Sequence, residues 1–130
     1  MLDHVGIAVA DLSAALDRWR PIVGAADAPP EEVPSQKVRV AFLTVGDAHV
    51  ELLEPTDPGS PVGQFLARRG EGLHHLAFRV PNVDAALADV ARRGGRLVDP
   101  VGRPGARGRR VGFAHPSAFG GVLVEFVESP

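Results

Sequence analysis

Two stretches of this 130-residue chain are copies of one another, and this duplication constrains the fold more than any other feature. The sequence HVGIAV at residues 4–9, followed by DLSAAL, returns as HLAFRV at residues 75–80, followed by NVDAAL. The two halves also end alike, with VELLEP at residues 50–55 and VEFVE at residues 124–128. Each half therefore carries one histidine and one glutamate in matching positions, and we expect two equivalent structural modules.

Composition limits the class of protein. A hydrophobic fraction of 45% is enough for a real core, and a net charge of −2 gives no electrostatic case for nucleic acid as a partner. The absence of cysteine excludes disulfides and thiolate metal sites, which leaves nitrogen and oxygen ligands. The sequence shows no signal peptide and no apolar run long enough to cross a membrane, so we expect a cytoplasmic protein with no membrane partner.

The order of predicted elements is the same in both halves. In the first half, alternating patterns predict a strand at residues 2–9 and a hairpin of two strands at 38–45 and 48–54, and residues 28–36 read as an edge strand with a loop. Between the first two strands, Asp11 caps a helix whose apolar stripe runs from Leu12 to Trp19, and Pro21 ends or kinks this helix. The second half predicts a strand, a helix and three strands at residues 73–80, 82–93, 96–100, 110–115 and 121–128.

These elements predict an α+β fold of two tandem βαβββ modules. We expect a single domain over residues 1–130, with module one at about 1–55, a linker with a short helix at 56–72, and module two at about 73–130. Neither module can bury a sheet face alone. Joined, they would form one curved mixed sheet with the helices outside and a concave face inside.

Strand alternation assigns the histidines to faces. With Val5 and Ile7 under the helix, His4 faces the concave side, and His75 is its counterpart in the second copy. His74 then points the other way, which indicates packing or a dimer contact. His49 shares a face with Glu51 and is expected near a strand end or beside a metal site.

Glu51 and Glu125 lie in the middle of apolar strands, where a carboxylate is costly unless it is paired or bound to metal. A salt bridge to an arginine such as Arg39 or Arg79 is the alternative. A salt bridge of this kind would have to arise twice, once for each glutamate and beside a histidine each time. The duplication therefore favours a metal site. Two imidazoles and two carboxylates with open positions suit Co²⁺, Mn²⁺, Ni²⁺, Zn²⁺ or Fe²⁺. Glu54 and Glu128 fall on the opposite strand faces and are expected to be solvated.

The chain resembles the vicinal oxygen chelate superfamily of glyoxalases, bleomycin resistance proteins and dioxygenases, and within it most resembles the methylmalonyl-CoA epimerase family. The most specific segments are SPVGQFL at residues 60–66, GEGLHHLAF at 70–78 and GGVLVE at 120–125. The resemblance implies that His4, Glu51, His75 and Glu125 bind one divalent metal ion per chain, Co²⁺, Mn²⁺, Zn²⁺ or Ni²⁺. It also implies an isomerase that interconverts R- and S-methylmalonyl-CoA, with an acyl-CoA substrate and a homodimeric state.

Epimerisation requires removal of a proton from one face of the α-carbon and its return on the other, through an enolate. Glu125 is the candidate acid/base for one face, and Glu51 is the symmetric candidate for the other. Some family members have a glutamate where this chain has Val40. The alternatives to Glu51 as the second acid/base group are therefore Glu31, Glu32 and Gln36, on the preceding strand or loop.

An arginine-rich loop and one histidine are candidate substrate contacts. Arg103 and Arg107, with Arg109 and Arg110 in the same glycine-containing loop, could hold coenzyme A phosphates or form a solvated surface. His115, before a proline, could contact substrate at the pocket rim or form a structural turn.

Two alternative functions remain open. One is a glyoxalase I-like lyase or isomerase, or another enzyme of the superfamily acting on a different substrate. Dioxygenases use two histidines and one carboxylate, and the fourth ligand here argues against them. The other alternative is a metal-free protein of the same fold that binds a small molecule and confers resistance, although such a protein need not retain both histidines and both glutamates.

Overall fold

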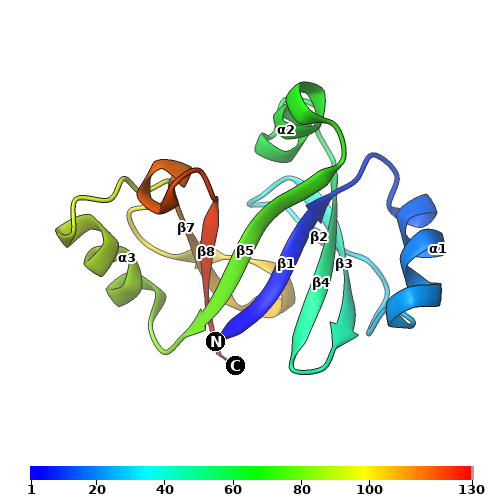
Figure 1. The fold of residues 1–130 in the computed structure, drawn as a ribbon, viewed down its shortest axis with the longest axis horizontal. Coiled ribbons are helices and arrows are strands. Elements are labelled where there is room, and N and C mark those ends of the chain that lie inside the picture. The colour runs from blue at the N-terminus through cyan, green and yellow to red at the C-terminus, as the bar shows by residue number, and fades with distance from the viewer. Residues whose placement is uncertain (130) are drawn as a thin grey trace. The chain divides into compact units, whose positions relative to one another are not determined.

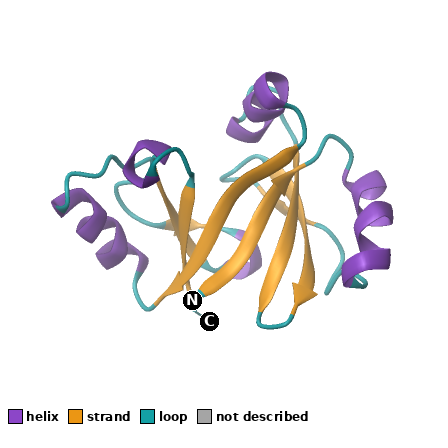
Figure 2. Cartoon of the chain, in the orientation of Figure 1, coloured by secondary structure: helices purple, strands orange, loops and turns teal. Residues whose placement is uncertain are grey.

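The structure, a computed structural model, describes residues 1–129. Figures 1 and 2 show an α+β protein, as predicted, in which strands from both halves of the chain are accompanied by helices. The elements of the described residues are β1 (Leu2–Ala8), α1 (Leu12–Val23), β2 (Glu31–Val33), β3 (Val38–Val45), β4 (Ala48–Pro55), α2 (Pro61–Arg69), β5 (Gly72–Val80), α3 (Val83–Arg92), β6 (Arg103–Pro104), β7 (Arg110–Ala114) and β8 (Val124–Glu128). Among residues 1–129, no helix is long and apolar enough to cross a membrane.

The chain divides into two compact units. We call His4–His74 the N-terminal unit, and Met1–Asp3 together with the chain from His75 onward the C-terminal unit. The division falls inside β1, between Asp3 and His4. The segment predicted as a linker, residues 56–72, contains α2 and lies within the N-terminal unit.

In the N-terminal unit the strand order is β2-β3-β4-β1. β1 is parallel to β4, and the other neighbouring pairs are antiparallel, so the sheet is mixed as predicted. Helix α1 begins after Asp11, whose side chain accepts a hydrogen bond from the N–H of Ala14. Its apolar stripe packs on the sheet face that β1, β3 and β4 turn toward it, in a core of Val9, Leu12, Ala15, Leu16, Ala41, Leu43 and Leu52.

The C-terminal unit repeats this topology with the order β5-β8-β7-β6. β5 is parallel to β8, and β8-β7 and β7-β6 are antiparallel. Asn82 caps α3 through the N–H of Ala85, the counterpart of Asp11. Gly112 lets α3 approach β7 closely, because a Cβ atom there would lie 2.7 Å from the Cδ1 atom of Leu87.

Several predicted boundaries differ from the structure: the edge strand is limited to Glu31–Val33, and the last strand begins at Val124 rather than at residue 121. Residues 96–100 do not form a strand: Leu97 makes one isolated bridge to Ala114, and the strand that follows α3 in the chain is β6, at Arg103–Pro104. The N–H of Phe113 donates a hydrogen bond to the side chain of Asp99. In a full strand, a backbone carbonyl would accept this hydrogen bond instead. Helix α1 does not end at Pro21 but continues to Val23. Pro21 lies near the C-terminal end of the helix, where the loss of one backbone hydrogen bond is tolerated.

The expectation that Glu54 and Glu128 are solvated holds only in part, because their side chains are 23% and 31% exposed. Oε2 of Glu54 accepts a hydrogen bond from the N–H of Leu12 at 2.9 Å, and Oε2 of Glu128 accepts one from the N–H of Val83 at 3.0 Å. Each carboxylate thus satisfies the first backbone N–H of the helix in its own unit, where the helix dipole favours negative charge.

Candidate metal centre

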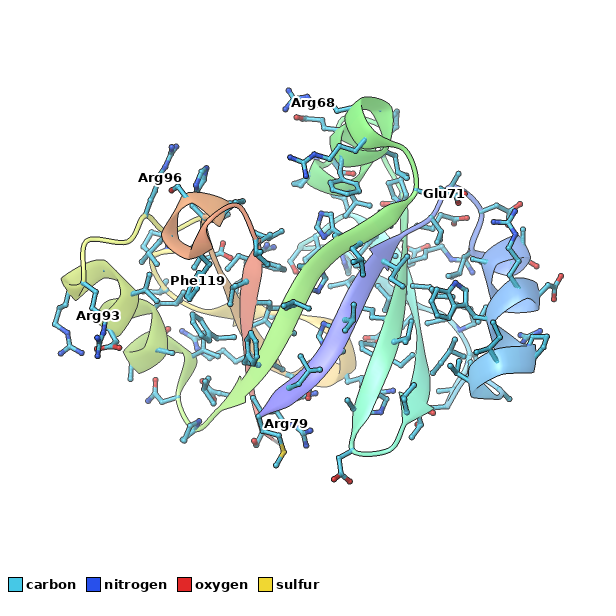
Figure 3. All side chains as sticks on the ribbon, viewed as in Figure 1. Arg68, Glu71, Arg79, Arg93, Arg96 and Phe119 are labelled. Atoms are coloured by element: carbon cyan, nitrogen blue, oxygen red, sulfur yellow. The ribbon has the colours of Figure 1, made fainter. Side chains whose placement is uncertain are left out.

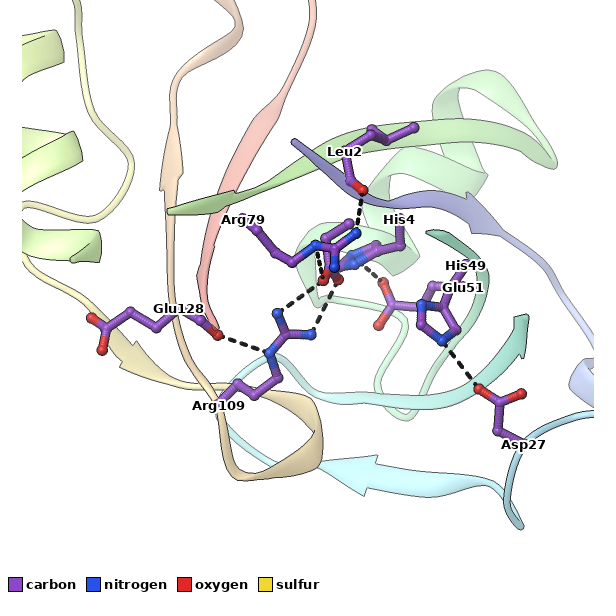
Figure 4. A network of polar contacts seen from close by, with 9 residues as sticks. Leu2, His4, Asp27, His49, Glu51, Arg79, Arg109 and Glu128 are labelled. Atoms are coloured by element: carbon purple, nitrogen blue, oxygen red, sulfur yellow. Dashed lines mark hydrogen bonds and ion pairs between the residues drawn. The ribbon is translucent and has the colours of Figure 1, made fainter. Parts of the chain in front are cut away.

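The N-terminal unit contains one buried histidine–glutamate pair. His4 on β1 and Glu51 on β4 are each 4% exposed. They are close because the parallel register places Glu51 opposite Gly6, on the same sheet face as His4. Nε2 of His4 lies 3.2 Å from Oε1 of Glu51 (Figure 4).

The C-terminal unit contains the equivalent pair. His75 on β5 is 4% exposed and Glu125 on β8 is 3% exposed. The register places Glu125 opposite Ala77, which is the counterpart of Gly6. Nε2 of His75 lies 3.1 Å from Oε1 of Glu125, so the internal duplication reproduces both the residues and their separation.

The spacing within each pair fits two ligands of one metal ion. Two ligand atoms about 2.1 Å from a metal are about 3.0 Å apart at a 90° angle and about 3.4 Å apart at the tetrahedral angle. The observed distances of 3.2 and 3.1 Å lie between these two values. Imidazole and carboxylate are donors that Co²⁺, Ni²⁺, Mn²⁺ and Zn²⁺ accept in five- or six-coordinate sites. The residues of both pairs therefore fit such an ion.

A phenylalanine packs against each of these histidines. The ring of Phe42 meets His4 edge to face at 5.6 Å, and the ring of Phe113 meets His75 in the same way at 5.5 Å. In the strand register Phe42 lies opposite Glu51, and Phe113 lies opposite Glu125. An aromatic ring thus covers each pair and shields the histidine nitrogen and glutamate oxygen atoms from water.

Two aspartates that hold the surroundings of Phe42 and Phe113 in place were not identified from the sequence. In the C-terminal unit, Asp99 accepts the N–H of Phe113 at 2.9 Å and lies 3.1 Å from Nε of Arg103. The guanidinium of Arg103 in turn stands over the Phe113 ring, 5.8 Å from its centroid. Asp99 therefore fixes both the backbone and one covering group of the ring that touches His75.

Asp27 is the counterpart in the N-terminal unit. It pairs with Nε2 of His49 at 3.2 Å and accepts a hydrogen bond from the hydroxyl of Thr44. The ring of His49 meets Phe42 edge to face at 5.9 Å. His49 is therefore a neighbour of the candidate site rather than a solvated strand-end residue. The near-equal spacing of Asp27 and Asp99 within their copies is the sequence signal that could have identified them.

The arginines considered as partners for the buried glutamates lie elsewhere. Nη1 of Arg39 is 3.5 Å from Glu54, and Nε of Arg79 is 3.4 Å from Asp3. His74 packs edge to face on Phe65 of α2 at 5.0 Å, which agrees with its predicted packing role.

Most of the arginine loop is engaged with carboxylates. Arg103 pairs with Asp99, and both Nη atoms of Arg109 contact the carboxylate of Asp3. Arg110 donates to both carboxylate oxygens of Asp84. The N–H of Gly102 and then Arg110 hold the pKa of Asp84 below its usual value. Binding of coenzyme A phosphates by Arg103 and Arg107 stays a prediction; Arg107 adopts a left-handed backbone with φ of 61°.

His115 makes local contacts that shape a turn. Its Nδ1 accepts the N–H of Ser117 at 3.0 Å and lies 2.8 Å from the Ser117 hydroxyl. This caps the short 3-10 helix Pro116–Phe119. The structural reading of His115 therefore has direct support, and its contact with substrate stays a prediction.

The chain belongs to the glyoxalase/bleomycin resistance protein/dioxygenase superfamily, whose sequence profile matches residues 3–113. Within this class it is similar to the ethylmalonyl-CoA/methylmalonyl-CoA epimerase of Cereibacter sphaeroides, at 39% identity over 95% of this chain and 94% of that protein. Its structure is similar to a variant methylmalonyl-CoA epimerase from Streptomyces coelicolor in complex with 2-nitronate-propionyl-CoA, with a TM-score of 0.94 and 40% identity over 99% of this chain and 94% of the other. A methylmalonyl-CoA epimerase in complex with methylmalonyl-CoA and NH4⁺ matches with a TM-score of 0.93 and 40% identity, over 98% of this chain and 93% of that one.

Proposed function

We infer that this protein is an epimerase that interconverts R- and S-methylmalonyl-CoA. The observation that carries the inference is the buried histidine–glutamate pair that each unit supplies, His4–Glu51 and His75–Glu125. Similarity to epimerases over almost the whole chain supports the same reaction and an acyl-CoA substrate.

We propose that the two pairs together hold one divalent metal ion, Co²⁺, Mn²⁺, Zn²⁺ or Ni²⁺. All four residues are buried, which suits ligands that are deprotonated and shielded from water. When bound, the ion supplies a Lewis acid that stabilises negative charge developing on the thioester oxygen of the substrate.

The glutamates of the two pairs move the proton. In one direction the carboxylate of Glu125 accepts the α-proton as the C–H bond breaks, and the electron pair delocalises into the enolate. Glu51 then donates a proton to the opposite face, which forms the new C–H bond and inverts the centre. The reverse direction exchanges the two roles. Val40, where some family members have a glutamate, is a fully buried apolar residue opposite Leu53, and we propose Glu51 as the second acid/base group in its place.

Deuterium exchange at the α-carbon of methylmalonyl-CoA in D₂O tests the proposal. Metal-loaded protein is expected to incorporate deuterium, EDTA-treated protein is not, and Glu125→Gln is expected to lower the rate by at least about 100-fold, the lower end of general acid–base contributions. Asp17→Asn, an exposed change on α1, is the control and is expected to leave the rate unchanged.

A protein that binds stoichiometric metal but gives no exchange would contradict the epimerase assignment. A glyoxalase-type substrate would then be the next to test. Exchange that persists after complete metal removal would contradict the metal-dependent route.

A homodimer, on the resemblance to the epimerase family, and a cytoplasmic location are part of the proposal. Light scattering after size-exclusion chromatography, expected to give twice the chain mass of 13.7 kDa, tests the first. Fractionation of the source cells tests the second.

A further inference from the structure

A buried carboxylate lies immediately before the first proposed metal ligand. Asp3 is 3% exposed and precedes His4 on β1. Nη2 and Nη1 of Arg109 donate to its two oxygens at 2.9 and 3.2 Å, and Nε of Arg79 lies 3.4 Å from the first of them (Figure 4). Asp3 and both arginines belong to the C-terminal unit.

Backbone contacts fix the two arginines in turn. Nε of Arg109 donates to the carbonyl of Glu128 on β8 at 2.9 Å. Nη2 of Arg79 donates to the carbonyl of Leu2, and the Arg79 N–H donates to the carbonyl of Met1 at 2.8 Å. Three segments of the C-terminal unit, β5, β8 and the residues before β7, therefore hold the start of β1.

Thermodynamic stability alone is a weak reason for such a cluster. The desolvation of buried charges offsets much of their attraction, and apolar replacements of similar volume are often as stable. The best-attested use of buried ionic groups is to fix one register among several. A forked guanidinium that meets both oxygens of a carboxylate fixes distance and orientation together.

We propose that the Asp3–Arg109 pair is a positioning device for His4. Asp3 and His4 are joined by one planar peptide unit, so a displacement or rotation at Asp3 passes directly to the Cα atom of His4. The pair holds that peptide from the face of β1 opposite to the one on which His4 meets Glu51. The inference rests on the proposed metal site, and Asp3 and Arg109 act through His4 without being ligands.

Metal affinity tests the proposal better than activity does. The variants are Arg109→Met, which removes the charge and keeps much of the stem, Asp3→Asn, which keeps the shape, and Arg109→Lys, which keeps the charge without the fork. Arg93→Met is the matched control, because Arg93 lies at the exposed end of α3 with its side chain 78% exposed (Figure 3). Dissociation constants for Co²⁺ are measured by competition with a chelator, with the visible spectrum of bound Co²⁺ and the melting temperature of the metal-free protein recorded alongside.

Arg109→Met and Asp3→Asn are expected to weaken Co²⁺ binding by about 10-fold or more and to change the Co²⁺ spectrum, since residues that orient ligands have effects of 10- to 100-fold. Arg109→Lys is expected to fall between these variants and the unaltered protein. Arg93→Met is expected to match the unaltered protein in affinity and spectrum.

Unchanged affinity and spectrum in Asp3→Asn and Arg109→Lys, with only a lower melting temperature, would overturn the positioning role and leave a structural ion pair. If Arg109→Met does not fold, these two variants still decide the matter. Failure of the unaltered protein to bind Co²⁺ would instead overturn the metal site itself, and the positioning role with it.

Discussion

The carboxylate of Glu54 accepts a hydrogen bond from the backbone N–H of Leu12 at 2.9 Å, so the end of strand β4 caps the start of helix α1. Glu128 and Val83 repeat this relationship at 3.0 Å in the C-terminal unit. In each unit the glutamate joins the sheet to the helix that packs on it, at the end of the helix where backbone N–H groups lack partners within the helix.

Loss of this cap is expected to destabilise the protein. Glu54→Ala removes both the acceptor and the charge near the helix N-terminus and is expected to lower the free energy of unfolding by about 1 kcal/mol, whereas Glu54→Gln keeps an acceptor and is expected to cost less. Urea denaturation monitored by circular dichroism measures both. Glu32→Ala, at an exposed position on β2, is the control. If Glu32→Ala and Glu54→Ala have equal free energies of unfolding, the capping role is contradicted.

Removal of Asp99 is expected to act on His75 through Phe113. Asp99→Ala leaves the N–H of Phe113 without its side-chain acceptor, and this is expected to cost about 1–3 kcal/mol of unfolding free energy. The NMR resonances of the His75 ring, which touches Phe113, should shift more than those of His74. Asp89→Ala, on the exposed face of α3, is the control. If the His75 resonances shift as much in Asp89→Ala as in Asp99→Ala, a specific link between Asp99 and His75 is ruled out.

Metal binding is expected to raise the melting temperature. A ligand at 100 times its dissociation constant stabilises the folded state by about 2.7 kcal/mol if it binds only that state. Differential scanning fluorimetry with EDTA, and then with excess Co²⁺ or Mn²⁺, measures the shift. Replacement of His75 by alanine should reduce the shift strongly, and an undiminished shift would place the binding elsewhere.

The acid stability of the protein is expected to depend on Asp84. The N–H of Gly102 and the guanidinium of Arg110 lower the pKa of Asp84 in the folded state below its usual 3.8. Its stabilising contribution is therefore present above that usual value and is lost as the pH falls through the lower, folded-state pKa. Asp84→Asn should flatten the acid limb of a plot of stability against pH, while Asp17→Asn, exposed on α1, should leave it unchanged.

The fold class and most elements could be predicted because they depend on local patterns. Alternation in β1 and β5, the cap at Asp11 and the two copies of the strand–helix segment are each visible within short windows. The failed strand at residues 96–100 shows the limit, since a side chain of Asp99 competing for a backbone N–H leaves no trace in hydrophobic periodicity.

The candidate site divides in the same way. Strand alternation was enough to place His4 with Glu51, because each faces the side opposite to its apolar neighbours. The contact of Asp3 with Arg109 joins residues at nearly opposite ends of the chain, and charged residues carry no periodic signal that would indicate such a partner. Only a folded structure reveals which of many arginines meets which carboxylate.

The cap at Glu54 also bears on how β4 finds its place. Glu51 and Glu54 are three positions apart on one strand, so their side chains project from opposite faces. A slip of one residue against β1 would turn Glu51 away from His4 and, in the same movement, remove Glu54 from α1. Mispaired forms of the strand would thus lose a helix cap as well as the contact between His4 and Glu51, so the capping bond favours the same strand alignment as the proposed metal site.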